Sequence, residues 1–351
     1  MHPLAIAGII LLAVVAAAAV ALLVYRDGNL HGEERLIQKA IDTGFTEKQV
    51  QINGAMLNYA EGPDNGPAVL LVHGQGVEWE DYAQVLPELA RDHHVFVVDC
   101  FGHGGSEHDP ALYSCETIGD AAIALAHEVI GEPYIVSGHS SGGILAAYIA
   151  ASDPAYAKAC VLEDPPFFSV LPDEVQEGAG AFVWYDGYLP AHEYVKSGST
   201  EPYPAFYAER SYLFGLFGGL QPKLAADTLV WCEQHPGEHV VTPWIPRDWT
   251  RGMYFMDDFD PAFGNAFYTG SWFEGIDQKQ LLRSIPCPTI YLKAETNYGD
   301  DGVLYAANTD EDAARVAELV PQCETRTIKS GHNIHYEHPD FFAQAIRDAA
   351  L

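Results

Sequence analysis

The segment Gly138-His139-Ser140-Ser141-Gly142 carries the residue types of a nucleophile turn. It follows an apolar run, 133–137, that predicts a buried strand, and it precedes an alanine-rich run, 144–151, that predicts a helix. A serine at the centre of G-x-S-x-G, on a strand-to-helix turn, presents its hydroxyl above a sheet because the glycines permit a sharp turn. The sequence therefore predicts that Ser140 is a nucleophile.

An upstream loop has the composition needed to stabilise negative charge. The run 67–72 predicts another buried strand, and it ends in His73-Gly74-Gln75-Gly76. Acyl transfer develops negative charge on a carbonyl oxygen, which preorganised backbone N–H groups stabilise. We expect one donor to be the N–H of Gln75 and the second to be the N–H of Ser141.

A general base is expected near the C-terminus. His332 lies in a glycine-containing loop, 330–335, just before the last predicted helix. A serine hydroxyl becomes a good nucleophile when an adjacent imidazole takes its proton, and that imidazole needs an orienting carboxylate. We therefore expect His332 to act on Ser140.

The three histidines at steps of three, His332, His335 and His338, also raise a metal-binding interpretation. A glycine and a proline, at 331 and 339, bracket this stretch, and no cysteine or second histidine cluster completes a ligand set. We expect no metal and no cofactor. His335 and His338 are predicted to lie at the pocket edge or on the surface.

Four motifs together resemble the α/β-hydrolase family: H-G-x-G at 73–76, D-x-x-G-x-G-x-S at 99–106, G-x-S-x-G at 138–142 and a late G-H at 331–332. They occur in the family's order, and the likeness covers roughly residues 50–351. It implies a mostly parallel sheet with helices on both faces and a mainly helical lid. Epoxide hydrolases and dehalogenases of this fold place aspartate at the nucleophile position, where this chain has serine.

The resemblance leaves the orienting carboxylate open. Most of the family takes it from the loop after the strand before the base, predicted at 288–294, but the corresponding residue here is Asn297. Some members take it from the end of the preceding strand, where this chain has Asp164. We expect Asp164 to orient His332, with Asp301 as the reserve. The competing interpretation of Asp164 is a turn aspartate before two prolines.

Composition excludes some classes of partner. The chain has 49 acidic and 18 basic residues, for a formal net charge of −31. Nucleic-acid binding needs a basic surface, so a nucleic-acid partner is not expected. Six cysteines are scattered without a C-x-x-C motif and are interpreted as reduced apolar residues.

The N-terminal segment is long and apolar enough to cross a bilayer. Residues 3–24 contain no charge, and a spanning helix needs about 20 residues. We expect a single-pass anchor at 1–25 and a stem at 26–48, with the alternative that a signal peptide is cleaved and the protein is secreted. Basic residues follow the segment and none precedes it, which favours a cytoplasmic catalytic domain but leaves the side of the membrane open.

The expected core comprises residues 49–165 and 287–351, with a lid between them at 166–286. The lid contains more than half of the chain's aromatic residues. Most are expected to form the lid's own core, and the rest a dry pocket for a bulky apolar group. The aromatic residues of interest are Trp184, Tyr185, Tyr188, Trp231, Trp244, Trp249, Trp272 and Phe273.

The expected reaction is hydrolysis of a carboxylic ester, thioester or lactone through a Ser140 acyl-enzyme, and the substrate is a small-molecule or lipid-like ester. Amide or carbon–carbon cleavage and acyl transfer use the same residues on the same fold. A ligand-binding sensor with weak turnover also stays open, because Asn297 departs from the family pattern.

Overall fold

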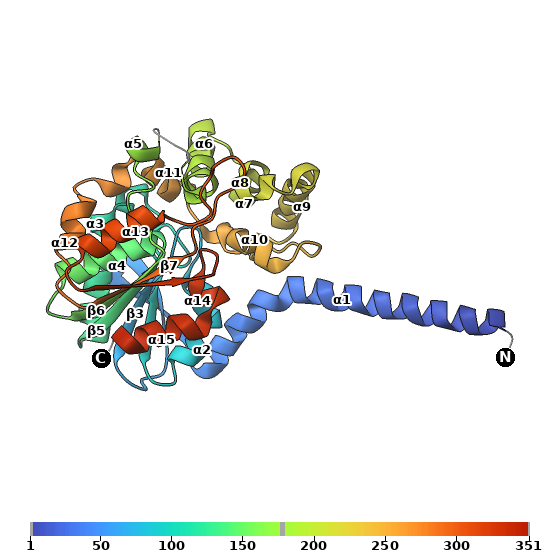
Figure 1. Ribbon diagram of the computed structural model, residues 1–351, viewed down its shortest axis with the longest axis horizontal. Coiled ribbons are helices and arrows are strands. Elements are labelled where there is room, and N and C mark those ends of the chain that lie inside the picture. The colour runs from blue at the N-terminus through green and yellow to red at the C-terminus, as the bar shows by residue number, and fades with distance from the viewer. Residues whose placement is uncertain (1–2, 176–179, 350–351) are drawn as a thin grey trace.

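The computed structural model describes residues 3–175 and 180–349 (Figure 1). An eight-stranded sheet with the order β1-β2-β4-β3-β5-β6-β7-β8 forms its centre. The first two strands are antiparallel to their neighbours, and the strands from β4 to β8 are parallel. The strands are β1 (Thr46–Ile52), β2 (Ala55–Glu61), β3 (Ala68–Val72), β4 (His94–Val98), β5 (Tyr134–His139), β6 (Ala157–Glu163), β7 (Thr289–Ala294) and β8 (Cys323–Ile328).

Helices cover both faces of the sheet, which explains why the central strands are apolar along their whole length. Successive side chains of a strand point to opposite faces. On β3, Leu70 and Val72 pack into one hydrophobic cluster, whereas Val69 and Leu71 pack into another. The first face carries α3 (Cys115–Leu125) and α4 (Ser141–Ser152), and the second carries α2 (Leu86–Leu89) and α15 (Pro339–Ala349). α13 (Asp310–Leu319) packs beside β8, and α14 (Ile334–Glu337) packs against α15.

The segment between β6 and β7 is helical, in agreement with the expected lid. It lies above the carboxyl ends of the parallel strands (Figure 1). Its last helix, α12, packs against α4 and α13, so the core resumes before the expected residue 287, because Leu281 and Leu282 are buried there. The helices are α5 (Pro172–Val175), α6 (Leu189–Ser197), α7 (Tyr203–Arg210), α8 (Tyr212–Gly215), α9 (Gln221–Gln234), α10 (Arg247–Tyr254), α11 (Pro261–Thr269) and α12 (Gln278–Arg283).

The predicted anchor and stem form one continuous helix, α1 (Pro3–Thr43). Its N-terminal part projects away from the domain, whereas Ile37 and Ala40 near its C-terminal end are buried in the core (Figure 1). Gly28 does not interrupt the helix, and the first strand begins at Thr46, three residues before the expected boundary of the core. The apolar part has a mean hydropathy of 2.6 and is 0% buried, so α1 has the length and composition of a membrane anchor or a signal sequence.

Candidate active site

Ser140 occupies a sharp turn between β5 and α4, with φ of 55° and ψ of −124°. Few non-glycine residues adopt such a positive φ, and strained turns of this kind often occur at functional sites. The neighbouring glycines allow close packing. A Cβ on Gly142 would overlap the carbonyl oxygens of Val72 and His73, and a Cβ on Gly138 would overlap the carbonyl of Gly142 itself. The two glycines of G-x-S-x-G are therefore required because the backbones of β5, α4 and β3 are in contact at these positions.

The loop after β3 lies against Ser140. A Cβ on Gly74 would approach the Ser140 Cβ to 3.0 Å, so only a glycine fits there without a shift. The Gln75 side chain points toward the lid, where its Nε2 donates to the carbonyl of Gly187 at 3.0 Å. Ser141 is the first residue of α4, and the N–H groups of a helix's first turn have no intrahelical acceptor. Both expected oxyanion donors thus belong to backbone segments that meet at Ser140.

Two buried histidines hold this loop in place. His73 accepts from the N–H of Cys100 at 2.9 Å through Nε2, and its Nδ1 lies 2.7 Å from the Gly74 carbonyl. His103 accepts from the N–H of Gly76 at 3.0 Å. Burial lowers the pKa of His73 to about 4 and lowers the pKa of His103 as well. Both rings are therefore neutral at pH 7, the state in which a ring nitrogen can accept these hydrogen bonds.

His332 pairs with Asp164. The His332 Nδ1 lies 2.7 Å from the Asp164 Oδ2, and Asp164 is fully buried just beyond the end of β6. The carboxylate also accepts from the N–H groups of Ala294 and Ala307, both at 3.2 Å. These contacts fix the carboxylate, and the carboxylate fixes the ring of His332.

The reserve acid lies elsewhere. Asp301 is exposed, and it accepts from the Tyr212 hydroxyl at 2.8 Å and from the N–H of Val303 at 3.1 Å. Asn297 accepts from the N–H of Tyr305 at 2.7 Å through its backbone carbonyl. The structure thus brings Asp164 to His332, and it places Asp301 in a turn that is tied to the lid helix α8.

The expected position of His335 at the pocket edge or surface is wrong, because this residue is fully buried beneath the site. Its Nδ1 lies 2.9 Å from a carboxylate oxygen of Glu163, and its Nε2 lies 3.0 Å from the Asp81 Oδ2. Burial opposes protonation, but the two carboxylates outweigh it and raise the pKa of His335 to about 9. Arg251 of α10 binds the other side of Asp81 and donates to its backbone carbonyl at 2.8 Å. His338 is half-buried, and its Nε2 lies 3.0 Å from the Lys329 carbonyl.

This buried ion network is what the sequence analysis missed. Its members, Asp81, Glu163, Arg251 and His335, come from four elements far apart in the chain, and no short motif marks them. The N–H of Ser140 donates at 2.9 Å to the carbonyl of Glu163, so the network lies directly behind the nucleophile turn. His139 joins the two layers, since its Nε2 lies 3.1 Å from the His332 carbonyl and its ring contacts that of His335.

Two side-chain groups have the spacing of small metal sites. Asp81, His139 and His335 form one, and Glu78, Glu80 and His239 form the other. In each, carboxylates raise the pKa of a histidine against the effect of burial, to about 9 for His335 and about 10 for His239. A protonated imidazole therefore already supplies positive charge to both groups.

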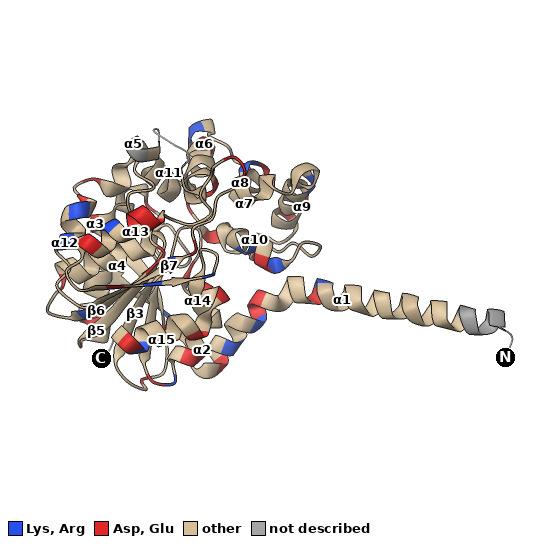
Figure 2. Ribbon diagram, in the orientation of Figure 1, with Lys and Arg blue, Asp and Glu red and all other residues tan. Residues whose placement is uncertain are grey.

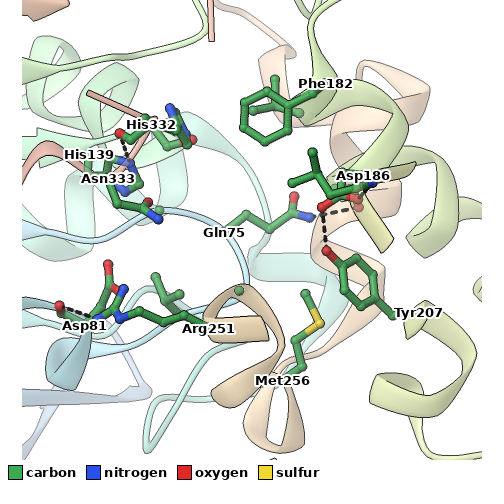
Figure 3. A pocket seen from close by; sticks show the side chains of 18 of the residues that line it. Gln75, Asp81, His139, Phe182, Asp186, Tyr207, Arg251, Met256, His332 and Asn333 are labelled. Carbon is green, nitrogen blue, oxygen red and sulfur yellow. Dashed lines mark hydrogen bonds and ion pairs between the residues drawn. The ribbon is translucent and has the colours of Figure 1, made fainter. Parts of the chain in front are cut away.

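A cavity of about 330 Å³ contains Ser140 and His332 in its wall. Gln75 lies between His332 and the lid residues Asp186 and Tyr207 (Figure 3). The lid contributes an apolar part of the wall, and Asp81, Asp248 and Arg251 add charged side chains to it. The apolar part consists of Phe182, Val183, Tyr188, Leu213, Phe214 and Met256. Phe182 packs edge-on against the ring of His332, with ring centroids 5.5 Å apart.

Asp186 is a buried lid carboxylate in this wall. Asp186 accepts hydrogen bonds from the Tyr207 hydroxyl, the Ser211 hydroxyl and the N–H of Leu213. Burial raises its pKa despite these donors. Asp186 therefore links its own segment to α7 and α8 within the lid.

A profile of the alpha/beta hydrolase family matches residues 69–345. The chain belongs to the α/β-hydrolase family. A soluble epoxide hydrolase of Corynebacterium and a fluoroacetate dehalogenase of Burkholderia are also similar in sequence over part of the chain, so family membership establishes a hydrolase and leaves the bond that is cleaved to further argument.

Curated relatives match only part of this chain. The chloroplastic pheophytinase of Arabidopsis thaliana is 30% identical over 33% of this chain and 31% of its own length. The lipase LipV of Mycobacterium tuberculosis is 35% identical over 30% of this chain and 39% of its own length. The chain thus aligns with about a third of the length of these relatives.

Solved structures extend the fold likeness over the whole chain. The crystal structure of a bacterial membrane phospholipase A superposes with a TM-score of 0.59 and 20% identity, and it covers 97% of both chains. At this identity the likeness concerns the fold alone.

Proposed function

We propose that this protein is a serine hydrolase that cleaves a carboxylic ester with a bulky apolar group. Ser140 attacks the carbonyl carbon while His332 takes the hydroxyl proton. The N–H groups of Gln75 and Ser141 stabilise the negative oxygen of the tetrahedral intermediate. His332 then protonates the leaving alcohol, which departs from a Ser140 acyl-enzyme. A water molecule deprotonated by His332 attacks the acyl-enzyme, the acid is released, and Ser140 recovers its proton.

The observation that supports this proposal most is the 2.7 Å contact between His332 and Asp164, in the wall of the cavity that also contains Ser140. In this arrangement the buried carboxylate holds the ring with Nδ1 protonated and Nε2 available as the base. The contact also supports Asp164, at the end of β6, for the orienting role that Asn297 leaves vacant after β7.

The apolar wall of the cavity favours an ester over a more polar substrate. Several lid side chains in this wall are aliphatic, aromatic or thioether groups, and they exclude water from the reacting carbonyl. The names of two similar proteins, a lipase and a membrane phospholipase A, favour a fatty-acid ester in particular. Thioesters, lactones, amides and carbon–carbon bonds are the alternatives for the same residues.

We also propose that α1 is an uncleaved membrane anchor. Its apolar part is exposed over its described length, while Asn29 and Glu33 farther along the same helix are buried against the domain. The helix is continuous through the alanine-rich region at 16–21, where a signal peptidase would have to cut. Cleavage there would leave a short exposed helical end still attached to the domain.

The test uses the full chain in detergent and p-nitrophenyl esters of increasing acyl length. We expect turnover by the wild type, with an optimum chain length that reports the size of the cavity, and no turnover by Ser140→Ala. The matched control is Ser152→Ala, an exposed serine at the other end of α4, which should keep wild-type turnover. Tight binding of an ester without turnover, equal in wild type and Ser140→Ala, would instead support the sensor.

A further inference from the structure

The lid contacts α1 at the point where the apolar part of that helix ends. Val24, the last residue of the uncharged run, is 66% exposed. The next residue, Tyr25, donates from its hydroxyl to the carbonyl of Trp244 at 3.2 Å. If α1 spans a bilayer with residues up to Val24, Tyr25 is at the bilayer surface, because a helix rises only 1.5 Å per residue. The lid segment beside Tyr25 must then lie at that surface too.

Further contacts hold the lid helix α10 and the segment before it against α1. The side chain of Asn29 donates to the Pro243 carbonyl and accepts from the N–H of Arg247, both at 3.2 Å. Arg251 pairs with Glu33 at 3.4 Å, and both residues are buried. Paired charges with little solvent contact are costly to separate. The lid helix α10 therefore keeps its position relative to the anchor.

An exposed apolar surface adjoins α10. We define the rim patch as Leu216, Phe217, Leu220 and Trp249. Trp249 is 63% exposed, Leu216 59% and Leu220 54%, and the half-buried Phe217 stacks on Trp249 with ring centroids 5.8 Å apart. Soluble surfaces rarely cluster such large apolar side chains without a partner.

The rim patch continues into the candidate active site. Trp249 lines the cavity together with Leu213 and Phe214, which precede Leu216 in the chain, and the same cavity reaches Ser140. An apolar surface thus leads from the outside of the lid to the nucleophile.

Aromatic residues and basic residues, the latter paired with or next to carboxylates, lie around the end of the anchor. The Lys223 ammonium lies 4.7 Å from the centre of the Trp244 ring, Arg26 follows Tyr25, and Arg247 begins α10. Figure 2 shows that the outer part of α1 carries no charge and that charged residues begin where the helix approaches α10. Tryptophan and tyrosine with neighbouring basic residues are typical of the headgroup region of a bilayer.

We infer that the rim patch docks on the surface of the bilayer that α1 spans, so that the cavity opens toward the acyl chains and the substrate is an acyl ester of the membrane itself. This inference rests on the proposed function for the substrate and on the proposed anchor for the geometry. The chemical class is a lipid with at least one long acyl ester, whose chain follows the apolar path from the rim patch to Ser140. A second protein covering the rim patch is the competing occupant, and the experiments below distinguish it.

The first experiment measures docking without catalysis. Full-length protein is reconstituted in phosphatidylcholine vesicles with and without dibrominated acyl chains, which quench nearby tryptophan. The contribution of Trp249 is the difference between wild type and Trp249→Phe. We expect bromine to reduce this contribution by about half or more, because an interfacial side chain reaches the acyl boundary. The matched control is Trp272→Phe, a lid tryptophan that is 0% exposed and whose contribution should not change. An unquenched Trp249 contribution would overturn the inference in favour of a protein partner.

The second experiment tests whether the enzyme takes its substrate from the membrane or from solution. The rim variant is the double substitution Leu216→Ser/Leu220→Ser. The control is the double substitution Val195→Ser/Tyr298→Ser, at two other exposed apolar residues. None of these four residues lines the cavity. For each protein the hydrolysis rate of vesicle phospholipid is divided by that of a soluble short-chain ester. We expect this ratio to fall about tenfold in the rim variant and to stay within about twofold in the control. Equal ratios in both variants would overturn the inference. If the wild type hydrolyses neither ester, the proposed function fails, and the quenching result still decides the docking.

Discussion

The Nδ1 of His332 lies 2.7 Å from the Oδ2 of Asp164, at the end of β6 and not in the loop after β7. The loop after β7 instead carries Asn297, whose side chain contacts the neighbouring Glu295. The position of the carboxylate thus differs from the commonest arrangement of the fold, while its relation to the histidine is the one that catalysis needs.

The first prediction concerns this carboxylate. Asp164→Asn should lower kcat by about 10³- to 10⁴-fold, because the amide no longer favours the ring tautomer that leaves Nε2 free as a base. Turnover of a p-nitrophenyl ester by purified, folded protein measures the effect. Asp301→Asn is the control and should stay within about threefold of wild type. A large loss in Asp301→Asn with little loss in Asp164→Asn would reassign the acid.

The second prediction concerns the buried pair of Arg251 and Asp81. Arg251→Met should lower the free energy of unfolding by about 3–5 kcal/mol, because it leaves buried carboxylates without their cation. Arg247→Met, which removes a neighbouring arginine with a 31% exposed side chain, should cost less than about 1 kcal/mol. Denaturant unfolding followed by circular dichroism gives both values. Similar losses of unfolding free energy in the two variants would show that the buried pair stabilises the fold no more than the partly exposed arginine does.

The third prediction is a dependence of stability on pH. His335 has a pKa of about 9 in the folded protein, above the value of about 6.5 for a free imidazole. Its protonation therefore stabilises the fold fully below pH 6.5, and this contribution is lost as the pH rises through 9. The free energy of unfolding should fall over this window by up to about 3 kcal/mol.

Thermal unfolding between pH 6 and 10 measures this dependence. His335→Gln should lose the His335 contribution and show a flatter profile, although it is less stable overall. His338→Gln, at a half-buried histidine outside this network, is the control and should keep the wild-type slope. Identical slopes in wild type and His335→Gln would mean that this imidazole is neutral in the folded protein.

The fourth prediction concerns the glycines of the nucleophile turn. Gly142→Ala should abolish most activity and destabilise the protein by about 1–3 kcal/mol or more, because the new methyl group overlaps two carbonyl oxygens of the β3 loop. In contrast, Gly28→Ala in α1 has open space around the new Cβ and should stabilise the helix by about 0.5–1 kcal/mol. Differential scanning calorimetry and ester turnover on both variants test the contrast. Full activity in Gly142→Ala would show that the turn relaxes easily.

The sequence predicts the parts of the site that are local in the chain. The strand-to-helix turn at Ser140, the loop around Gln75 and the loop of His332 each have a motif, because a backbone turn and its residue requirements lie within a few positions. Asp164 was identified by its place at a strand end. Its pairing with His332 depends on how β6 and the loop before α14 approach each other, which only the fold specifies.

The buried network behind the site could not be predicted in the same way. Asp81, Glu163, Arg251 and His335 lie far from one another in the sequence, and charged residues are normally exposed. Only the packing of α10 and α14 on the sheet brings them together. The expected boundary between anchor and stem at 25/26 does not interrupt α1, which is one continuous helix. Contacts of Asn29 and Glu33 with the lid support the helix across Gly28, and these contacts are not visible in the local sequence.

The central claim, that Ser140 is an activated nucleophile, is tested most directly by the mass of the intact protein after reaction with a fluorophosphonate. Full-length wild type and Ser152→Ala should each gain one phosphonyl group, with peptide mapping to Ser140, and Ser140→Ala should gain none. A folded wild type that gains no group, or a group that maps to Ser141, would contradict the account.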